Sequence, residues 1–284
     1  MSQHSQEAAH RDKPIITLQA ASGWAFPDFR ELWTYRELLY FFVLRDIKVR
    51  YRQTILGALW AIIQPLALAV AFWLVFKKIA GVDTGGVPYP LFAYTALVPW
   101  TLFSQSLTHG SISLVGGAAM ISKVYFPRMI VPLAAAASFL LDFVIGLAIL
   151  AIAIVYYGRT PSAAIVLLPL FALMAFLCAF SIVLWLSSLN VRYRDIRYAV
   201  PFLLQLLLFA SPLGYSARNV EGAGKWAFAL NPVTGIAEGF RWAALGVPRP
   251  SLIYLIVPTV GTAVLLVSGL LYFRKTERTF ADIV

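Results

Sequence analysis

The chain has 284 residues, of which 60% are hydrophobic, and its mean hydropathy is +0.78. Soluble domains are about 45–50% apolar, so a soluble core cannot hide this excess and lipid must be the solvent for much of the chain. The formal net charge is +10, but the basic residues punctuate apolar runs instead of covering one face of a water-soluble body. This pattern favours anionic lipid headgroups as partners and argues against nucleic acid.

The N-terminal segment 1–28 is polar and contains no apolar core followed by a small-residue cleavage site. We expect a flexible cytoplasmic tail there, with the first span serving as an uncleaved insertion signal. Residues 29–48 repeat apolar side chains partly at helical spacing, which predicts an amphipathic helix lying in the membrane interface. A short helix packed on a soluble partner is the alternative.

The first span begins at a sharp change of composition. The basic cluster around Arg50 and Arg52 stops at Gln53, and no charged residue follows until Lys77. Such a boundary is typical of a helix that leaves a negatively charged membrane surface. A transmembrane helix needs about 20 mostly apolar residues. Apolar runs of this kind predict an all-α membrane protein with six spans, at about 55–77, 90–112, 131–157, 164–189, 198–215 and 252–273.

Lysine and arginine are distributed unevenly between the two sides of these spans. Sixteen of the 23 fall on the side that carries both termini, and seven fall on the other side. Because an excess of positive charge marks the cytoplasmic side, both termini are expected in the cytoplasm, including a short tail at 276–284. An even number of spans agrees with this orientation.

The segment 216–250 lies between the fifth and sixth spans on the outer side. Its apolar stretches are too short to cross and are interrupted by Gly and Pro, while Trp226 and Trp242 suit a membrane interface. Backbone that dips into a membrane without crossing survives only against protein or a watery cavity. We therefore expect two short re-entrant helices, split near Asn231 and Pro232. An ordinary surface loop with interfacial helices is the alternative.

Motifs that would supply energy or catalysis are missing. Gly222 to Lys225 is the nearest match to a phosphate-binding loop, but Asn219 stands where the first glycine belongs and Trp226 follows the lysine. The single cysteine, Cys178, provides neither an internal disulfide nor a metal-ligand set. We expect a chain that is not an enzyme and has no cofactor or metal of its own. If ATP is used, another chain binds it.

Five motifs occur in order along the chain: RYRQTILGALWAIIQPL (50–66), LVPWTLFSQSL (97–107), ISKVYFPRMIVPL (121–133), LNVRYRDIRY (189–198) and ALNPVTGIAEGFRWA (229–243). Together they resemble ABC transporter permeases of the polysaccharide-export type, which export O-antigen, capsule and teichoic-acid chains. The resemblance implies a homodimer in the bacterial inner membrane, bound to two copies of a separate ATPase subunit that holds ATP and Mg. It also implies export of an undecaprenyl- or other lipid-linked glycan.

The resemblance assigns roles to two loops on the cytoplasmic side. The loop 121–133 corresponds to the element that docks in a groove of the ATPase, and a rigid surface with charge and aromatic rings suits the transmission of motion. Its expected coupling residues are Lys123, Tyr125, Phe126, Pro127 and Arg128. The second loop, 190–198, offers another contact through Arg192, Arg194 and Asp195, and Asp195 can pair with either arginine. For both loops the alternative is a basic anchor that only enforces topology.

Glycans are bound by flat aromatic faces together with a few hydrogen bonds, and 14% of the chain is aromatic. The expected substrate conduit comprises Trp60, Trp73, Tyr94, Trp100, Phe103 and Asp142. Packing and interfacial positions are the alternative for each aromatic residue. Asp142 is the only carboxylate well inside an expected span. It faces the conduit, pairs with a basic group, or lies near a span boundary.

The two mouths of this conduit carry further expected residues. At the cytoplasmic mouth, Arg50 and Arg52 either meet the phosphates of the arriving lipid or only anchor the first span. In the resembling family, the outer segment forms a gate at the periplasmic mouth. Its expected residues are Trp226, Phe228, Asn231, Pro232, Glu238, Arg241 and Trp242.

Three other functions stay open at this point. An ABC permease for a drug, haem or another lipid shares the helix layout. A membrane glycosyltransferase needs catalytic carboxylates, and the loop carboxylates here are widely separated. A secondary flippase usually has more spans or an internal repeat.

Overall fold

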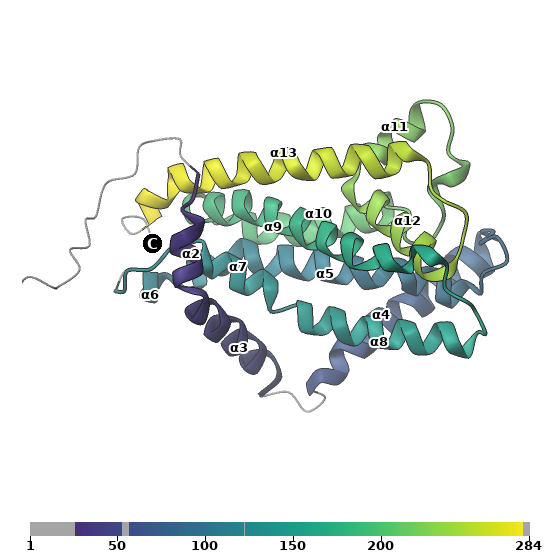
Figure 1. The fold of residues 1–284 in the computed structure, drawn as a ribbon, viewed down its shortest axis with the longest axis horizontal. Coiled ribbons are helices and arrows are strands. Elements are labelled where there is room, and N and C mark those ends of the chain that lie inside the picture. The colour runs from purple at the N-terminus through teal and green to yellow at the C-terminus, as the bar shows by residue number, and fades with distance from the viewer. Residues whose placement is uncertain (1–25, 53–56, 122, 281–284) are drawn as a thin grey trace, which may run out of the picture.

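The computed structural model describes residues 26–52, 57–121 and 123–280, and all regular structure within these ranges is helical. The expected all-α class is confirmed for this part of the chain. The long helices run side by side in an elongated bundle, with α2 (Phe29–Thr34) at one end and α11 (Ala223–Leu230) at the other (Figure 1). We call these the α2 end and the α11 end.

The segment expected to form one helix over 29–48 folds as two. α2 starts after Asp28, whose carboxylate accepts a hydrogen bond from the Arg30 N–H at 2.8 Å. α3 (Arg36–Arg52) follows Tyr35 and runs obliquely along one edge of the bundle, toward the start of α4 (Figure 1). Its position in a membrane interface stays a prediction. The expected tail lies outside the described residues from 1 to 25.

The third expected span is interrupted. In place of one helix over 131–157, the chain forms α7 (Ile130–Ala137) and α8 (Leu140–Tyr156), with Ser138 and Phe139 between them. The Ser138 hydroxyl donates a hydrogen bond to the Ala135 carbonyl at 2.9 Å and accepts one from Arg50 of α3 at 2.6 Å. A contact from a distant part of the chain therefore stabilises the break, where the sequence has neither glycine nor proline.

The other expected spans are also helical. The first contains α4 (Trp60–Phe72), which passes into a π-helical turn at Trp73–Ile79. Residues 53–56, at its expected start, lie outside the described residues. The remaining long elements are α5 (Tyr89–Gly116), α9 (Leu168–Arg192), α10 (Ile196–Ala210) and α13 (Leu252–Thr276).

α5 is the central helix of the bundle. It packs on α4, α7, α8, α9, α10 and the short helix α12 (Pro232–Leu245). Its contact with α9 depends on Gly110, because a Cβ at that position would lie 2.7 Å from the methyl groups of Val183. Replacing this glycine would force the two most extensively packed helices apart.

Four helical stretches are long and apolar enough to cross a membrane: Trp60–Ile79, Ile130–Tyr156, Ala163–Arg192 and Leu252–Thr276. α5 has the length but is less apolar, since it carries Ser, Thr, Gln and His side chains. α10 is apolar but has 15 residues, and a helix of that length extends only about 22 Å. Length and composition thus support four of the six expected spans.

The outer segment forms two short helices that meet at Asn231, as expected. Asn231 caps α12, because its side-chain oxygen accepts a hydrogen bond from the Val233 N–H at 3.0 Å. α12 is buried against α5, α9 and α13, and it ends at Gly246 in the left-handed conformation. The re-entrant position of these helices in a membrane stays a prediction.

Candidate functional site

The end of α3 places Arg50 against the break between α7 and α8. The guanidinium forms an ion pair with Asp142, with Nη1 and Oδ2 2.7 Å apart, and donates from Nη2 to the Ser138 hydroxyl. It also lies over the ring of Phe139, 3.5 Å from the centroid. The Tyr51 hydroxyl donates a second hydrogen bond to Asp142. We call these five residues the Arg50 cluster.

The break explains the position of Asp142. Since α8 begins at Leu140, this carboxylate lies in the first turn of a helix, where negative charge is favoured. Its side chain is 13% exposed and that of Arg50 is 24% exposed, so the pair is only partly shielded from solvent. Of the expected alternatives for Asp142, the structure supports pairing with a basic group. Arg52, by contrast, is exposed at the end of α3.

Two cavities adjoin the Arg50 cluster. The first has a volume of about 340 Å³ and lies between α3, α4, α5 and α8; it is lined by Arg50, Tyr51, Gly57, Trp60, Ala61, Gln64, Pro65, Thr101, Gln105, His109, Phe139 and Asp142. The second, of about 470 Å³, lies between α3, α5 and α7. Arg50 and His109 line both. These volumes fall in the range of small-molecule sites.

The expected coupling loop is anchored on both sides. Phe126 is 4% exposed and packs on Phe42 of α3, with ring centroids 5.7 Å apart. On the other side, the Arg128 backbone N–H donates to the Glu277 carboxylate at 3.2 Å, and the Arg128 guanidinium donates to the Glu277 carbonyl. Glu277 follows directly after α13. The loop therefore links the end of α13 to α3.

Two of the expected coupling residues reach solvent at the α2 end. Tyr125 is 66% exposed and Lys123 is also exposed, whereas Pro127 is buried. The Tyr125 hydroxyl donates to Glu31 of α2 at 3.3 Å. Partial burial, and then the Glu31 carboxylate, raise the pKa of Tyr125. Any partner that binds this loop meets Lys123 and Tyr125 before it meets Phe126.

In the second expected loop, the charged side chains are exposed. Arg192, Arg194 and Asp195 all face solvent. The expected pairing is wrong: within the described residues, which include both arginines, Asp195 forms no ion pair. Its backbone carbonyl instead accepts hydrogen bonds from the first turn of α10, which leaves its carboxylate in solvent.

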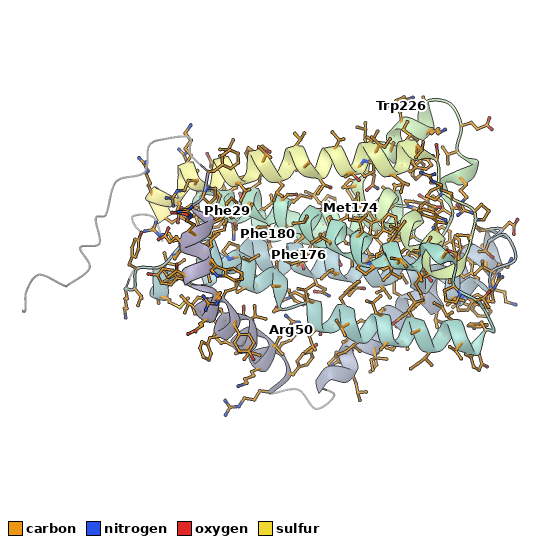
Figure 2. All side chains as sticks on the ribbon, viewed as in Figure 1. Phe29, Arg50, Met174, Phe176, Phe180 and Trp226 are labelled. Carbon is orange, nitrogen blue, oxygen red and sulfur yellow. The ribbon has the colours of Figure 1, made fainter. Side chains whose placement is uncertain are left out.

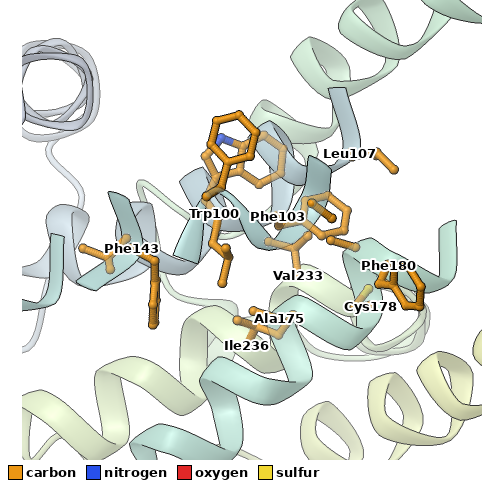
Figure 3. Close-up of a cluster of buried hydrophobic side chains, with 14 of the residues drawn as sticks. Trp100, Phe103, Leu107, Phe143, Ala175, Cys178, Phe180, Val233 and Ile236 are labelled. Carbon is orange, nitrogen blue, oxygen red and sulfur yellow. The ribbon is translucent and has the colours of Figure 1, made fainter. Parts of the chain in front are cut away.

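The aromatic residues of the expected conduit divide into two groups. Tyr94, Trp100 and Phe103 are buried within the helix bundle, and Figure 3 shows Trp100 and Phe103 among the apolar side chains of the core. Trp60 is 44% exposed and lines the first cavity. Trp73 lines a separate apolar pocket of about 510 Å³ between α4, α5 and α8. Tyr94 borders the same pocket as Trp73, whereas Trp100 and Phe103 pack the core.

At the α11 end, Glu238 and Arg241 of α12 are fully buried and form an ion pair at 3.1 Å. The Arg241 guanidinium donates to three backbone carbonyls of the loop after α10, those of Pro212, Leu213 and Tyr215, at 2.5–3.0 Å. Glu238 accepts hydrogen bonds from Ser216 and from the Ala217 N–H. This buried pair therefore holds the loop that connects α10 to the outer helices.

The remaining residues of the expected gate differ in exposure. Trp226 is 60% exposed on α11, and Figure 2 shows it at the far end of the bundle from Phe29. Phe228 is partly buried and packs on Tyr215, with ring centroids 6.0 Å apart. Trp242 packs on Phe171 at 6.4 Å. Pro232 is the first residue of α12. Trp226 is thus the most exposed aromatic side chain among the expected gate residues.

Comparison with known proteins identifies the family. The pattern described as ABC-2 type transporter matches residues 37–245, from α3 to the end of α12. The chain belongs to the ABC-2 type transporter family. The matched range contains both the Arg50 cluster and the Glu238–Arg241 pair.

Curated relatives of this ABC-2 chain include O-antigen export system permease proteins RfbA from two bacteria. One from Klebsiella pneumoniae is 28% identical over 249 residues, which cover 87% of this chain and 95% of the relative. One from Myxococcus xanthus is 28% identical over 255 residues, which cover 89% and 97%. The similarity therefore extends over nearly the whole length of both proteins.

The sequence interpretation missed several polar residues that this ABC-2 chain gathers at the Arg50 cluster. Gln64 and Gln105 line the first cavity with Thr101 and His109. A signal for three of them exists, since Thr101, Gln105 and His109 recur every fourth residue on one helical face. No helical spacing of this kind marked Ser138 in the sequence.

Across the described residues, no group of three His, Cys, Asp or Glu side chains is arranged to hold a metal ion.

Proposed function

We propose that the chain is the permease subunit of an ATP-driven exporter that moves a lipid-linked polysaccharide across the bacterial inner membrane. The observation that carries this function is the cavity beside Arg50, where a cation, hydrogen-bonding side chains and the open face of Trp60 meet at the start of the first span. Such a set suits a sugar in the cavity, with the lipid phosphate at the basic rim beside it. The relatives named as O-antigen export permeases support the same substrate class.

The proposed membrane position has six spans, formed by α4, α5, α7 with α8, α9, α10 and α13. α2 and α3 lie in the cytoplasmic interface, and α11 and α12 form re-entrant helices on the periplasmic side, with both termini in the cytoplasm. The arrangement is supported by the opposite positions of Phe29 and Trp226 (Figure 2) and by the excess of basic residues on the side of the termini.

The active complex contains two copies of this chain and two copies of a separate ATPase subunit, which binds ATP and Mg. Closure of the ATPase subunits moves the coupling loop through its exposed residues, Lys123 and Tyr125. Because Phe126 of the same loop packs on Phe42 of α3, the motion reaches the helix that carries Arg50. The ATPase cycle thereby changes the cavity in which the lipid headgroup waits.

The glycan then passes through a conduit between the two copies. Within it, Trp60 offers an aromatic face to the sugar, and the buried Tyr94, Trp100 and Phe103 maintain the helix packing behind it. At the periplasmic mouth, the Glu238–Arg241 pair keeps the connecting loop in place while the exposed Trp226 borders the exit.

Co-expression with an ABC ATPase subunit tests this function. We expect the two proteins to purify together and ATP hydrolysis to rise when an undecaprenyl-linked oligosaccharide is added in lipid nanodiscs. A hydrophobic drug or haem at the same concentration serves as the control ligand. Stimulation by the drug or haem, with none by the oligosaccharide, would assign a different substrate. Failure to bind an ABC ATPase subunit would contradict the exporter itself.

A further inference from the structure

The first cavity has a polar wall, and the packing of the helix bundle does not require polar side chains there. Thr101, Gln105 and His109 follow one face of α5, and Gln64 reaches the same space from α4. Gln105 stands about 24 Å along α5 from its first residue, well inside the length of a spanning helix. Four polar side chains from α4 and α5 therefore border one space in the bundle.

The two glutamine amides have no hydrogen-bond partner among the residues that the structure describes. Neither Gln64 nor Gln105 makes a side-chain hydrogen bond to any residue that the structure describes, and both border the cavity. An amide left without partners in an apolar medium costs about 2–7 kcal/mol. Inside a membrane, these amides need a hydrogen-bonding ligand or water in the cavity.

The chemistry of the wall indicates the ligand. Each amide supplies two donors and one acceptor oxygen, so it can serve a hydroxyl group as donor and as acceptor at once. The one cation of the wall, Arg50, is already paired with Asp142, which makes the pair neutral as a unit. A neutral wall with paired donors and acceptors suits hydroxyl-rich groups better than a second anion. Trp60 and Phe139 add flat apolar faces.

We propose that this cavity is a sugar-binding subsite in which Gln64 and Gln105 hydrogen-bond to the hydroxyls of the first sugar on the lipid carrier. The phosphates stay at the basic rim, near the exposed Arg52. The subsite rests on the proposed export function and adds a way to distinguish the loaded lipid carrier from the empty one. A carrier that bears a sugar binds more tightly than an empty carrier, so unloaded lipid is left behind.

Equilibrium binding to the full-length chain in lipid nanodiscs tests the subsite. The probes are undecaprenyl pyrophosphate and undecaprenyl pyrophosphoryl-N-acetylglucosamine, which differ only in the sugar. We expect the wild type to bind the sugar-bearing lipid about thirtyfold more tightly, since two hydrogen bonds contribute about 1 kcal/mol each and each 1.4 kcal/mol is tenfold. Gln64→Leu and Gln105→Leu should lose most of that difference and leave the affinity for undecaprenyl pyrophosphate unchanged.

Gln205→Leu is the matched control. Gln205 is an exposed glutamine on the apolar helix α10, outside the residues that line the cavity. We expect this variant to bind both lipids like the wild type. An equal loss in Gln205→Leu, or equal wild-type affinities for the two lipids, would overturn the subsite while leaving recognition of the lipid pyrophosphate in place. If the wild type binds neither lipid, the subsite and the proposed substrate class are both contradicted. If a variant fails to fold, the two wild-type affinities still test whether the cavity binds the sugar.

Discussion

At the scale of single residues, Arg241 is a charged side chain without solvent contact. Because the guanidinium is buried, any N–H group left without an acceptor would be costly. Its N–H groups donate to Glu238 and to carbonyls of the α10–α11 connection. Its guanidinium also lies over the ring of Phe92, 3.7 Å from the centroid. A fork of five N–H groups can serve several acceptors at once, which a lysine ammonium in the same place cannot reproduce.

Replacing this arginine should destabilise the protein strongly. Arg241→Met leaves the Glu238 carboxylate buried without its closest cation and removes the donors from four carbonyls. Loss of one partner of a buried ion pair costs about 3–5 kcal/mol. We expect a clear drop in the melting temperature in detergent. Arg249→Met, at an exposed position on the same side of the molecule, should change it little. Equal melting temperatures for the two variants would contradict the role of Arg241.

At the scale of elements, α12 shows how a short helix is held inside the bundle. Gly235 faces α13 so closely that a Cβ would lie 2.2 Å from the carbonyl oxygen of Tyr254. Gly239 similarly makes room for the ring of Phe171. Small residues at these two positions let α12 approach its neighbours, which is a common device in membrane helix packing.

An alanine at Gly235 should therefore separate α12 from α13. Because the obstructing atom belongs to the backbone, neither helix can yield cheaply, and overpacking of this kind costs about 1–3 kcal/mol. Gly261→Ala on α13 is the control, since nothing lies within 4 Å of the added Cβ. That control should be neutral or stabilise the helix by up to about 1 kcal/mol. Thermal unfolding of both variants checks the prediction, and a stable Gly235→Ala protein would refute it.

At the scale of the whole molecule, the α2 end forms one connected surface. The coupling loop contacts α2 through Tyr125 and Glu31, α3 through Phe126 and Phe42, and the end of α13 through Glu277. Three segments that are distant in sequence thus contact one loop. A partner that displaces this surface acts on the first and the last helices together.

Removing the link to α13 should uncouple ATP hydrolysis from export. Glu277→Ala deletes the carboxylate that accepts from the Arg128 N–H and from Arg274. Hydrogen bonds to charged groups contribute about 1.5–3 kcal/mol, so we expect export to fall about tenfold or more while ATP hydrolysis by the complex persists. Export and hydrolysis are measured side by side in proteoliposomes. Glu221→Ala, at the exposed far end, is the control. A parallel fall of both activities would contradict coupling through Glu277.

The sequence predicted the helical fold well because membrane spans leave a strong local signal. Apolar length located α4, α5, α9, α10 and α13, and Asn231 with Pro232 marked the division between α11 and α12. The break at Ser138 was missed, since a contact from Arg50 maintains it and no local breaker precedes it. The structure places Trp100 and Phe103 in the core and Tyr94 at an apolar pocket, and their role in a conduit stays a prediction. Aromatic character alone does not distinguish a lining residue from a core residue.

The sequence by itself determined that the chain is a helical membrane protein, because hydrophobicity and charge act locally and are read along the chain. Only the tertiary structure decided that Arg50 pairs with Asp142, that Gln64 and Gln105 share a cavity, and that Arg241 holds the connecting loop. These pairings join residues that are distant in sequence. The packing of helices against one another brings these residues together, and the periodicity within a single helix does not predict which residues will meet.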